Sequence, residues 1–218
     1  MAQVGYDAFR NMLLGAAARI RDQHELLSKL DSVGGDGDHG TTMLRAMANL
    51  EQAAHVADPP LDGVGVLEDL LRDVGWAIMG VDGGATGPLF GMLFMSMADA
   101  VAGRDVLDAP ALASAFEAGL EGVRQQTKAQ PGDKTLIDAL APAVAALREA
   151  AAAGAQAGEA LRQGADAARR GAEATKAMQA RFGRAKNVGK DTIGSQDPGA
   201  TSVALMFEGF CDGLEASP

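Results

Sequence analysis

The sequence predicts an all-α fold in which eight helices form an antiparallel bundle or a closed helical barrel. Apolar residues recur at steps of three and four along most of the chain, while β-branched runs with a period of two are absent. Breaks rich in glycine and proline separate the helical segments, and short connections favour antiparallel neighbours. The length of 218 residues is typical of one domain with one core, spanning residues 1–218.

The apolar periodicity predicts four helices in the first half of the chain. They span about residues 6–30, 41–55, 64–79 and 88–102. Thr41 or Thr42 can cap the second helix, which Pro59 and Pro60 close. The fourth helix is apolar on all sides, so we expect it in the middle of the protein.

Four more helices are predicted in the second half. They span about residues 111–128 and 134–153, a segment that reaches about residue 182, and residues 198–214. Pro142 predicts a kink or a tilted start in the sixth helix. Asp197 can cap the last helix, with Pro198 at its first position. Alanine and glycine fill residues 150–174, which indicates close contact between helices, with a low-complexity linker as the alternative.

Composition excludes several classes of protein. The 19 Lys and Arg residues face 29 Asp and Glu residues, and a net charge of -10 disfavours binding to nucleic acid. The single cysteine, Cys211, cannot form an internal disulfide, and the early charges leave no apolar leader, so we expect a cytoplasmic protein. The most apolar stretch, residues 88–98, is about half of the roughly 20 residues that a membrane span needs.

The first glycine-rich break, LDSVGGDGDHGTTM, places Asp31, Asp36 and Asp38 within eight residues. Three close carboxylates repel each other unless a cation lies between them, and hard oxygen ligands suit Mg²⁺ or Ca²⁺. The glycines around them favour a joint site for a metal and a phosphate. A solvated acidic turn with helix-capping residues is the alternative.

Two other interpretations of this break fail. An EF-hand starting at Asp36 would need glycine where Thr41 stands and glutamate where Met47 stands. A dinucleotide fingerprint matches at Gly35, Gly37 and Gly40, but that motif follows a strand and a helix precedes it here. The sequence also lacks Cys/His zinc spacing and a Ser–His–acid arrangement.

The second break, GGATG at residues 83–87, opens the fourth helix, where free amides and the helix dipole favour an anion and Thr86 can donate a hydroxyl. An ordinary tight turn is the alternative. The third break, PGDKT, is not a Walker A motif, because Lys128 and Asp133 occupy its glycine positions. Its Asp133 and Lys134 are either charges in the first turn of a helix or contacts to a phosphate.

The fourth break combines Arg184, Lys186, Asp197 and Gly199, an unusual basic content for an acidic protein. Its cations can face a phosphate, with a plain solvated loop as the alternative. Among the histidines, His24 and His55 are expected at helix surfaces. His39 follows Asp38 directly and can orient a carboxylate or contact a phosphate.

Taken in order, the four breaks resemble those of the nucleotide-binding L subunit of dihydroxyacetone kinases. The resemblance runs through LDSVGGDGDHGTTM, GGATGPLFG, PGDKTLIDAL and MQARFGRAKNVGKDTIGSQDPGATS and covers essentially the whole chain. It implies a barrel of eight antiparallel helices with the nucleotide, ATP or ADP, at one rim. It also implies that Asp31, Asp36 and Asp38 coordinate two Mg²⁺ ions.

The resemblance further implies which residues contact the nucleotide. These are His39, Gly40, Thr41, Thr42, Ala85, Thr86, Leu136 near the adenine, Arg184, Asp197, Pro198 and Gly199. Because phosphoryl transfer depends mainly on positioning and charge neutralisation, the protein needs no nucleophile of its own.

In this family a separate K subunit holds the ketose, so the resemblance implies half of an enzyme. Thr42 and Ser195 depart from the L subunits that keep ADP and are recharged by an M subunit in a phosphoenolpyruvate-dependent relay. We therefore expect ATP as the donor, with that relay as the alternative, and a short-chain ketose as the acceptor. A non-catalytic module that signals to a transcription regulator and a helical scaffold without a ligand are hypotheses of other classes.

Overall fold

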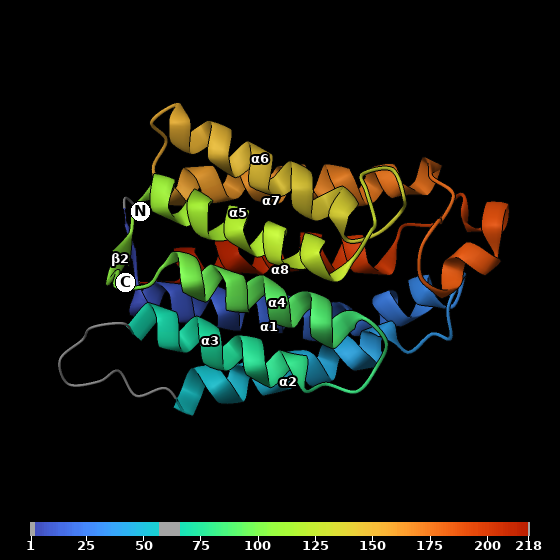
Figure 1. Cartoon of the computed structure of the whole chain (residues 1–218), viewed down its shortest axis with the longest axis horizontal. Helices are drawn as coiled ribbons and strands as arrows, with labels where there is room; N and C mark the ends of the chain where they lie inside the picture. The colour runs from blue at the N-terminus through green and yellow to red at the C-terminus, as the bar shows by residue number, and fades with distance from the viewer. Residues whose placement is uncertain (1–2, 57–65, 218) are drawn as a thin grey trace.

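Eight α-helices run alternately up and down the long axis of the computed structural model, which describes residues 3–56 and 66–217 (Figure 1). Within these ranges the helices are α1 (Tyr6–Asp31), α2 (His39–Val56), α3 (Val66–Met79), α4 (Thr86–Ala100), α5 (Ala109–Gln126), α6 (Ile137–Ala152), α7 (Ala157–Ala174) and α8 (Pro198–Glu215). The predicted all-α fold is confirmed. The expected helix end at Pro59 and Pro60 and the expected start near Val64 lie outside the described residues.

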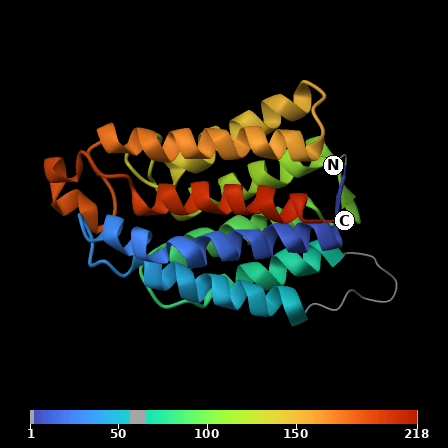
Figure 2. The ribbon, with the colours of Figure 1, turned by 180° about the vertical axis from the view of Figure 1, so that it is seen from behind.

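The helices form a closed ring, because each one packs against its neighbours in the chain and α8 packs against α1 (Figures 1 and 2). A two-stranded antiparallel ribbon, β1 (Val4–Gly5) with β2 (Val106–Leu107), joins the two segments at the end where the chain termini lie. The sequence did not predict this ribbon, since two-residue strands are too short to show a period of two. No helix in the described ranges is both long and apolar enough to cross a membrane.

Several predicted helix boundaries are wrong by two or more residues, and three of them border the glycine-rich breaks in an informative way. The second helix starts at His39 and not at Thr41 or Thr42, and the backbone N–H of Thr42 donates to the carbonyl of Asp38 (2.9 Å). The sixth starts at Ile137, because Lys134 has a left-handed backbone (φ 61°) that a helix cannot contain. The seventh ends at Ala174 and continues only as a short 3-10 turn, η1 (Thr175–Ala177).

The start of the last helix is confirmed at Pro198, and the side chain of Asp197 accepts a hydrogen bond from the backbone N–H of Ala200 (2.7 Å). Pro142 lies inside α6 and donates no hydrogen bond to the carbonyl of Asp138. Helix α7 passes close to α6 at this carbonyl, because Gly171 has no Cβ to collide with it. The alanine- and glycine-rich residues 150–174 therefore form closely packed helices and not a linker.

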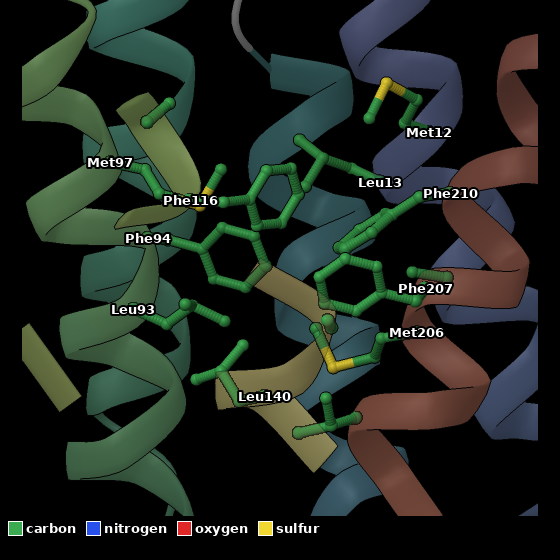
Figure 3. Packing of buried hydrophobic residues seen from close by; sticks show 14 of the residues in the cluster. Met12, Leu13, Leu93, Phe94, Met97, Phe116, Leu140, Met206, Phe207 and Phe210 are labelled. Atoms are coloured by element: carbon green, nitrogen blue, oxygen red, sulfur yellow. The ribbon is translucent and has the colours of Figure 1, made fainter. Parts of the chain in front are cut away.

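The core fills the ring with side chains from all of its helices (Figure 3). Phe116 of α5 contacts Phe207 and Phe210 of α8, with ring centroids 5.0 and 5.8 Å away. We expected helix α4 in the middle of the protein. It is instead one of the helices that form the ring, and it exposes Pro88 and Asp99. A ring of eight helices has side chains and no helix at its centre, so even its most apolar helix has an outer face.

All four glycine-rich breaks lie at the same end of the ring, opposite the termini (Figure 1, right). They connect α1 to α2, α3 to α4, α5 to α6 and α7 to α8. The alternation of an antiparallel ring makes every second connection return to the same end. Segments far apart in sequence, such as those of His39 and Ser202, therefore meet there.

Candidate functional site

The four breaks surround a cavity of about 550 Å³ at this end of the ring. Most of the site residues expected from the sequence line it. These are Asp31, Asp36, Asp38, His39, Ala85, Thr86, Leu136, Arg184, Asp197, Pro198 and Gly199. One concave site thus collects residues from all four breaks, as expected of a small-molecule site.

Three expected contact residues do not line the cavity, namely Gly40, Thr41 and Thr42. Gly40 faces α1, where a Cβ would collide with the carbonyl of His24. Thr41 is exposed, and Thr42 is buried beneath Gly83. These three residues belong to the first turn of α2, which begins at His39.

The acidic cluster consists of Asp31, Asp36 and Asp38. One carboxylate oxygen from each lies within 4.8 Å of the other two. Asp31, at the end of α1, is half-buried and accepts hydrogen bonds from the backbone N–H groups of Gly37 (2.9 Å) and His39 (3.4 Å). This hydrogen bonding fixes the loop around Asp31, while Asp36 and Asp38 remain exposed at the mouth of the cavity. Three convergent hard oxygen donors fit Mg²⁺ or Ca²⁺.

An ion pair between Arg184 and Asp36 connects the first break to the fourth. Arg184 begins a 3-10 turn, η2 (Arg184–Asn187), whose Ala185 packs directly against Gly34. A Cβ on Gly34 would come within 2.7 Å of the Ala185 Cβ, so a larger residue there would separate the two loops. The guanidinium is largely exposed, so it can exchange its carboxylate for a phosphate.

His39 lies behind the acidic cluster in a hydrogen-bonded chain. Its Nε2 lies 2.9 Å from the hydroxyl of Ser202, and that hydroxyl donates to the carbonyl of Pro198 (3.0 Å). The imidazole Nε2–H is therefore the donor to Ser202, and Nδ1 faces the Thr86 hydroxyl at 3.5 Å. Burial lowers the pKa of His39, while the nearby Asp31 carboxylate raises it less. These hydrogen bonds hold the neutral imidazole of His39 between α2, α4 and α8.

The second break presents backbone amides at the start of α4. Gly83 (φ 138°) and Gly84 (φ 58°) make the turn, and no side chain caps the helix at Ala85. The first N–H groups of α4 thus remain available at the cavity wall beside Thr86. Free amides together with the positive end of the helix dipole favour an anion at this position.

The third break is built around buried charges. The Asp138 carboxylate accepts backbone hydrogen bonds from Gly132 (2.5 Å) and Thr135 (2.8 Å). The Lys134 ammonium donates to the carbonyls of Thr175 (2.7 Å) and Ser195 (2.5 Å). Lys134 is therefore not a charge in the first turn of a helix, as one of our alternatives had it. It connects the third break to the fourth.

Burial shifts the pKa values of two side chains in these segments, Asp197 and Lys134. It raises the pKa of Asp197 to about 7, although the Ala200 N–H and the Lys134 ammonium oppose that shift. Burial also lowers the pKa of Lys134. Near neutral pH the carboxyl of Asp197 thus exists in both protonation states.

Sequence reasoning did not identify the apolar wall of the cavity. Leu89 and Phe90 of α4 and Phe182 of the fourth break line it beside Leu136. Leu89 and Phe90 were hidden within an apolar helix, and Phe182 within the wrongly extended seventh helix. The one available signal was the glycine after Phe182, which marks the start of a loop. A cavity with both apolar side chains and an acidic mouth suits a ligand with a flat apolar part and an anionic part.

The chain is similar to several known proteins. The model of the DAK2 domain family matches residues 33–212. The ADP-binding subunit DhaL of PEP-dependent dihydroxyacetone kinase 1 from Listeria innocua is 37% identical over 87% of this chain and 87% of its own length. The ADP-binding subunit DhaL of the PEP-dependent dihydroxyacetone kinase from Escherichia coli is 37% identical over 85% of this chain and 86% of its own length.

Among solved structures, the dihydroxyacetone kinase of C. freundii is similar in its native form, with a TM-score of 0.71 and 26% identity over 94% of this chain. The same enzyme in complex with AMP-PNP and Mg²⁺ gives a TM-score of 0.70. This chain spans about a third of the length of that enzyme. The similarity therefore concerns one part of a longer kinase.

Proposed function

The chain belongs to the DAK2 domain family, and we propose that residues 1–218 form one nucleotide-binding domain that transfers a phosphoryl group to a short-chain ketose such as dihydroxyacetone. The family predicted from the sequence is thus confirmed, and the chain is a phosphotransferase subunit like its relatives. The observation that carries the proposal is the acidic cluster at the mouth of a cavity that apolar side chains also line. A nucleotide has this polarity, with phosphates at one end and a base at the other.

In this proposal Asp31, Asp36 and Asp38 would hold two magnesium ions, and these would offset the charge of the nucleotide phosphates. The hard oxygen donors and their mutual approach within 4.8 Å support a divalent cation at this position. When bound, magnesium would neutralise charge on the transferred phosphoryl group. The chain itself supplies the fixed position of the carboxylates, through the amides that hold Asp31.

The remaining cavity residues bind the nucleotide. The free amides beside Ala85 and Thr86 favour the phosphates, and Arg184 adds a cation from the opposite loop. Leu136 and the turn at residues 197–199 border the apolar wall, where the base fits. Because Gly40, Thr41 and Thr42 lie outside the cavity, the proposal gives them no direct contact.

For the phosphoryl donor, the named relatives support the alternative more than our first expectation. Both closely matched bacterial relatives are ADP-binding subunits of PEP-dependent kinases. We therefore propose a resident ADP that is recharged by a phosphoryl-carrying M-type subunit. ATP as an exchanging donor is the second candidate, supported by the similar kinase that binds AMP-PNP with Mg²⁺.

The ketose is bound by a partner, in this proposal a K-type subunit that docks at the open end of the ring. The acidic cluster and Arg184 lie at that end, so a phosphoryl group held there can meet a sugar on another chain. Nucleotide-dependent metabolism and a lone, half-buried cysteine fit a cytoplasmic location. Turnover with a K-type subunit would separate this function from a signalling module without catalysis.

Calorimetric titration of the nucleotide-stripped chain with ADP and with ATP, each with and without Mg²⁺, tests the site. We expect Mg²⁺-dependent binding that weakens at least about 100-fold in Asp36→Ala, because a charged contact to the metal is lost. Asp22→Ala removes the same charge from an exposed position of α1 and serves as the matched control. Equal binding by Asp36→Ala and the control would refute the metal site.

The same preparation distinguishes the two donors. A resident cofactor predicts that ADP stays bound through gel filtration and exchanges slowly with added ATP. An exchanging donor predicts release of ADP within the time of one turnover. The measurement is the dissociation rate of ADP in the presence of excess ATP.

A further inference from the structure

Lys134 is a buried cation in an unusual backbone conformation at the wall of the cavity. Lys134 is 5% exposed. Among the described residues, it is the one residue other than glycine that has a left-handed backbone, with φ 61°. Such a conformation costs about 1 kcal/mol or more in an unbranched residue. The fold therefore keeps a strained, desolvated lysine at this position.

The ammonium of Lys134 connects two walls of the cavity that are distant in sequence. It donates to the carbonyl of Thr175 at the end of α7 and to the carbonyl of Ser195 just before α8. The hydroxyl of Thr175 accepts the backbone N–H of Asp197 (2.8 Å) and donates to the carbonyl of Ala172 (2.6 Å). Lys134 thus holds the segment that leads to Asp197 from both sides.

The anchored segment faces Leu136, two residues beyond Lys134. A Cβ on Gly199 would lie 3.5 Å from the Leu136 Cβ and 3.2 Å from Oδ1 of Asp197. Leu136 and Gly199 therefore pack against each other in one wall of the cavity, and the position of that wall depends on the segment that Lys134 holds. The carboxylates nearest to the Lys134 ammonium accept hydrogen bonds from backbone amides. Asp138 accepts from Gly132 and Thr135, and Asp197 accepts from Ala200.

We propose that Lys134 is a positioning residue that sets the affinity for the nucleotide by holding the turn at residues 197–199 against Leu136 in the wall of the cavity. The inference rests on the proposed function, because it concerns the base side of the same cavity. Lys134 contacts neither the acidic cluster nor Arg184 in the described interactions. Lys134 accordingly affects the binding of the nucleotide. It does not affect the binding of Mg²⁺ in the absence of nucleotide.

The test compares Lys134→Met and Lys134→Arg with a control, Lys128→Met, which changes an exposed lysine of the same loop. All three residue types at position 134 are unbranched, so the backbone strain stays the same. The measurements are the dissociation constant of ADP with Mg²⁺, the binding of Mg²⁺ alone, the thermal midpoint, and hydrogen exchange of residues 175–199.

We expect ADP affinity to fall at least about tenfold in Lys134→Met, since two hydrogen bonds from a charged donor are lost. Binding of Mg²⁺ alone stays as in the parent chain, and amides of residues 175–199 exchange faster. Lys134→Arg retains most of the affinity because it keeps a charged donor, and Lys128→Met behaves like the parent chain. A merely structural role would lower the thermal midpoint without this difference between ADP and Mg²⁺.

Unchanged ADP affinity in a folded Lys134→Met variant overturns the inference and leaves the proposed function intact. Failure of the parent chain to bind ADP overturns the proposed function and this inference with it. If Lys134→Met does not fold, Lys134→Gln decides the question, because the uncharged amide can still donate one hydrogen bond. We expect several-fold weaker ADP binding in that variant, and parent-like binding again overturns the inference.

Discussion

Glycine serves different purposes at the α1–α8 seam and at the rim of the cavity. At the seam Gly15, Gly209 and Gly213 have helical backbones, and a Cβ on any of them would collide with the backbone of the facing helix. At the rim Gly84 and Gly132 have positive φ values of 58° and 95°, and a Cβ on either would meet nothing within 4 Å. The seam uses the small volume of glycine, whereas the rim uses its backbone freedom.

This difference separates stability from function along the length of the ring. The seam joins the first and last helices and closes the ring, so its packing supports the whole fold. At Gly84 and Gly132 the rim makes open turns, where an added side chain meets no neighbouring atom and strains only the backbone. Substitutions in the two regions therefore have different expected costs.

The largest effect is expected for Gly213→Ala at the seam. The added methyl group would overlap the carbonyl of Asn11, and two helix backbones must separate to relieve the collision. We expect the free energy of unfolding to fall by about 3 kcal/mol or more, as for severe overpacking. Urea denaturation measures this cost, and a loss below about 1 kcal/mol would show that the seam can adapt.

A pH-dependent effect is expected for Asp197→Asn at the rim. The pKa of Asp197 is raised from 3.8 to about 7 by burial, so the folded chain keeps a proton that the unfolded chain has already lost. The parent chain should therefore lose stability as the pH rises from about 4 to about 7, by up to about 3 kcal/mol. Asparagine can still cap α8 but does not ionise.

The measurement for this variant is the difference in unfolding free energy between Asp197→Asn and the parent chain. Relative to its value near pH 4, that difference should shift in favour of the variant up to about pH 8. A constant difference over this range would contradict the raised pKa.

A smaller effect on the free energy of unfolding is expected for Asp38→Asn, and its sign depends on whether Mg²⁺ is present. Without Mg²⁺ the variant should be more stable than the parent chain, by on the order of 0.5 kcal/mol, because one of three close carboxylates is neutralised. With Mg²⁺ the parent chain gains stability from binding and the variant gains much less. Thermal unfolding with and without Mg²⁺ measures both, with Asp22→Asn as the control.

Of the two glycine substitutions, Gly84→Ala at the rim is expected to have the smaller and simpler cost. The new methyl group meets no atom within 4 Å, so only the left-handed backbone is penalised. We expect a loss of about 1 kcal/mol, measured by urea denaturation beside Gly213→Ala. A cost equal to that of Gly213→Ala would remove the distinction between seam and rim.

The helices could be predicted because apolar periodicity is a local property of the chain. The stripe from Tyr6 to Leu30 matches α1 within one residue, and the cap and first turn of α8 at Asp197 and Pro198 were recognised from residue type alone. The acidic residues were recognised for the same reason, since they lie within one loop. The errors arose where distant segments impose a conformation, as at Lys134, whose left-handed backbone ends the possible helix.

The sequence by itself determined the number of helices, their alternation and the four glycine-rich breaks, because each depends on neighbours a few residues away. Only the tertiary structure decided which residues share the cavity. It placed Leu136 opposite Gly199, connected Lys134 to Thr175 and Ser195, and turned Thr42 under Gly83. These relations depend on the closure of the ring by α1 and α8, and that closure is a sum of contacts between segments far apart in the chain.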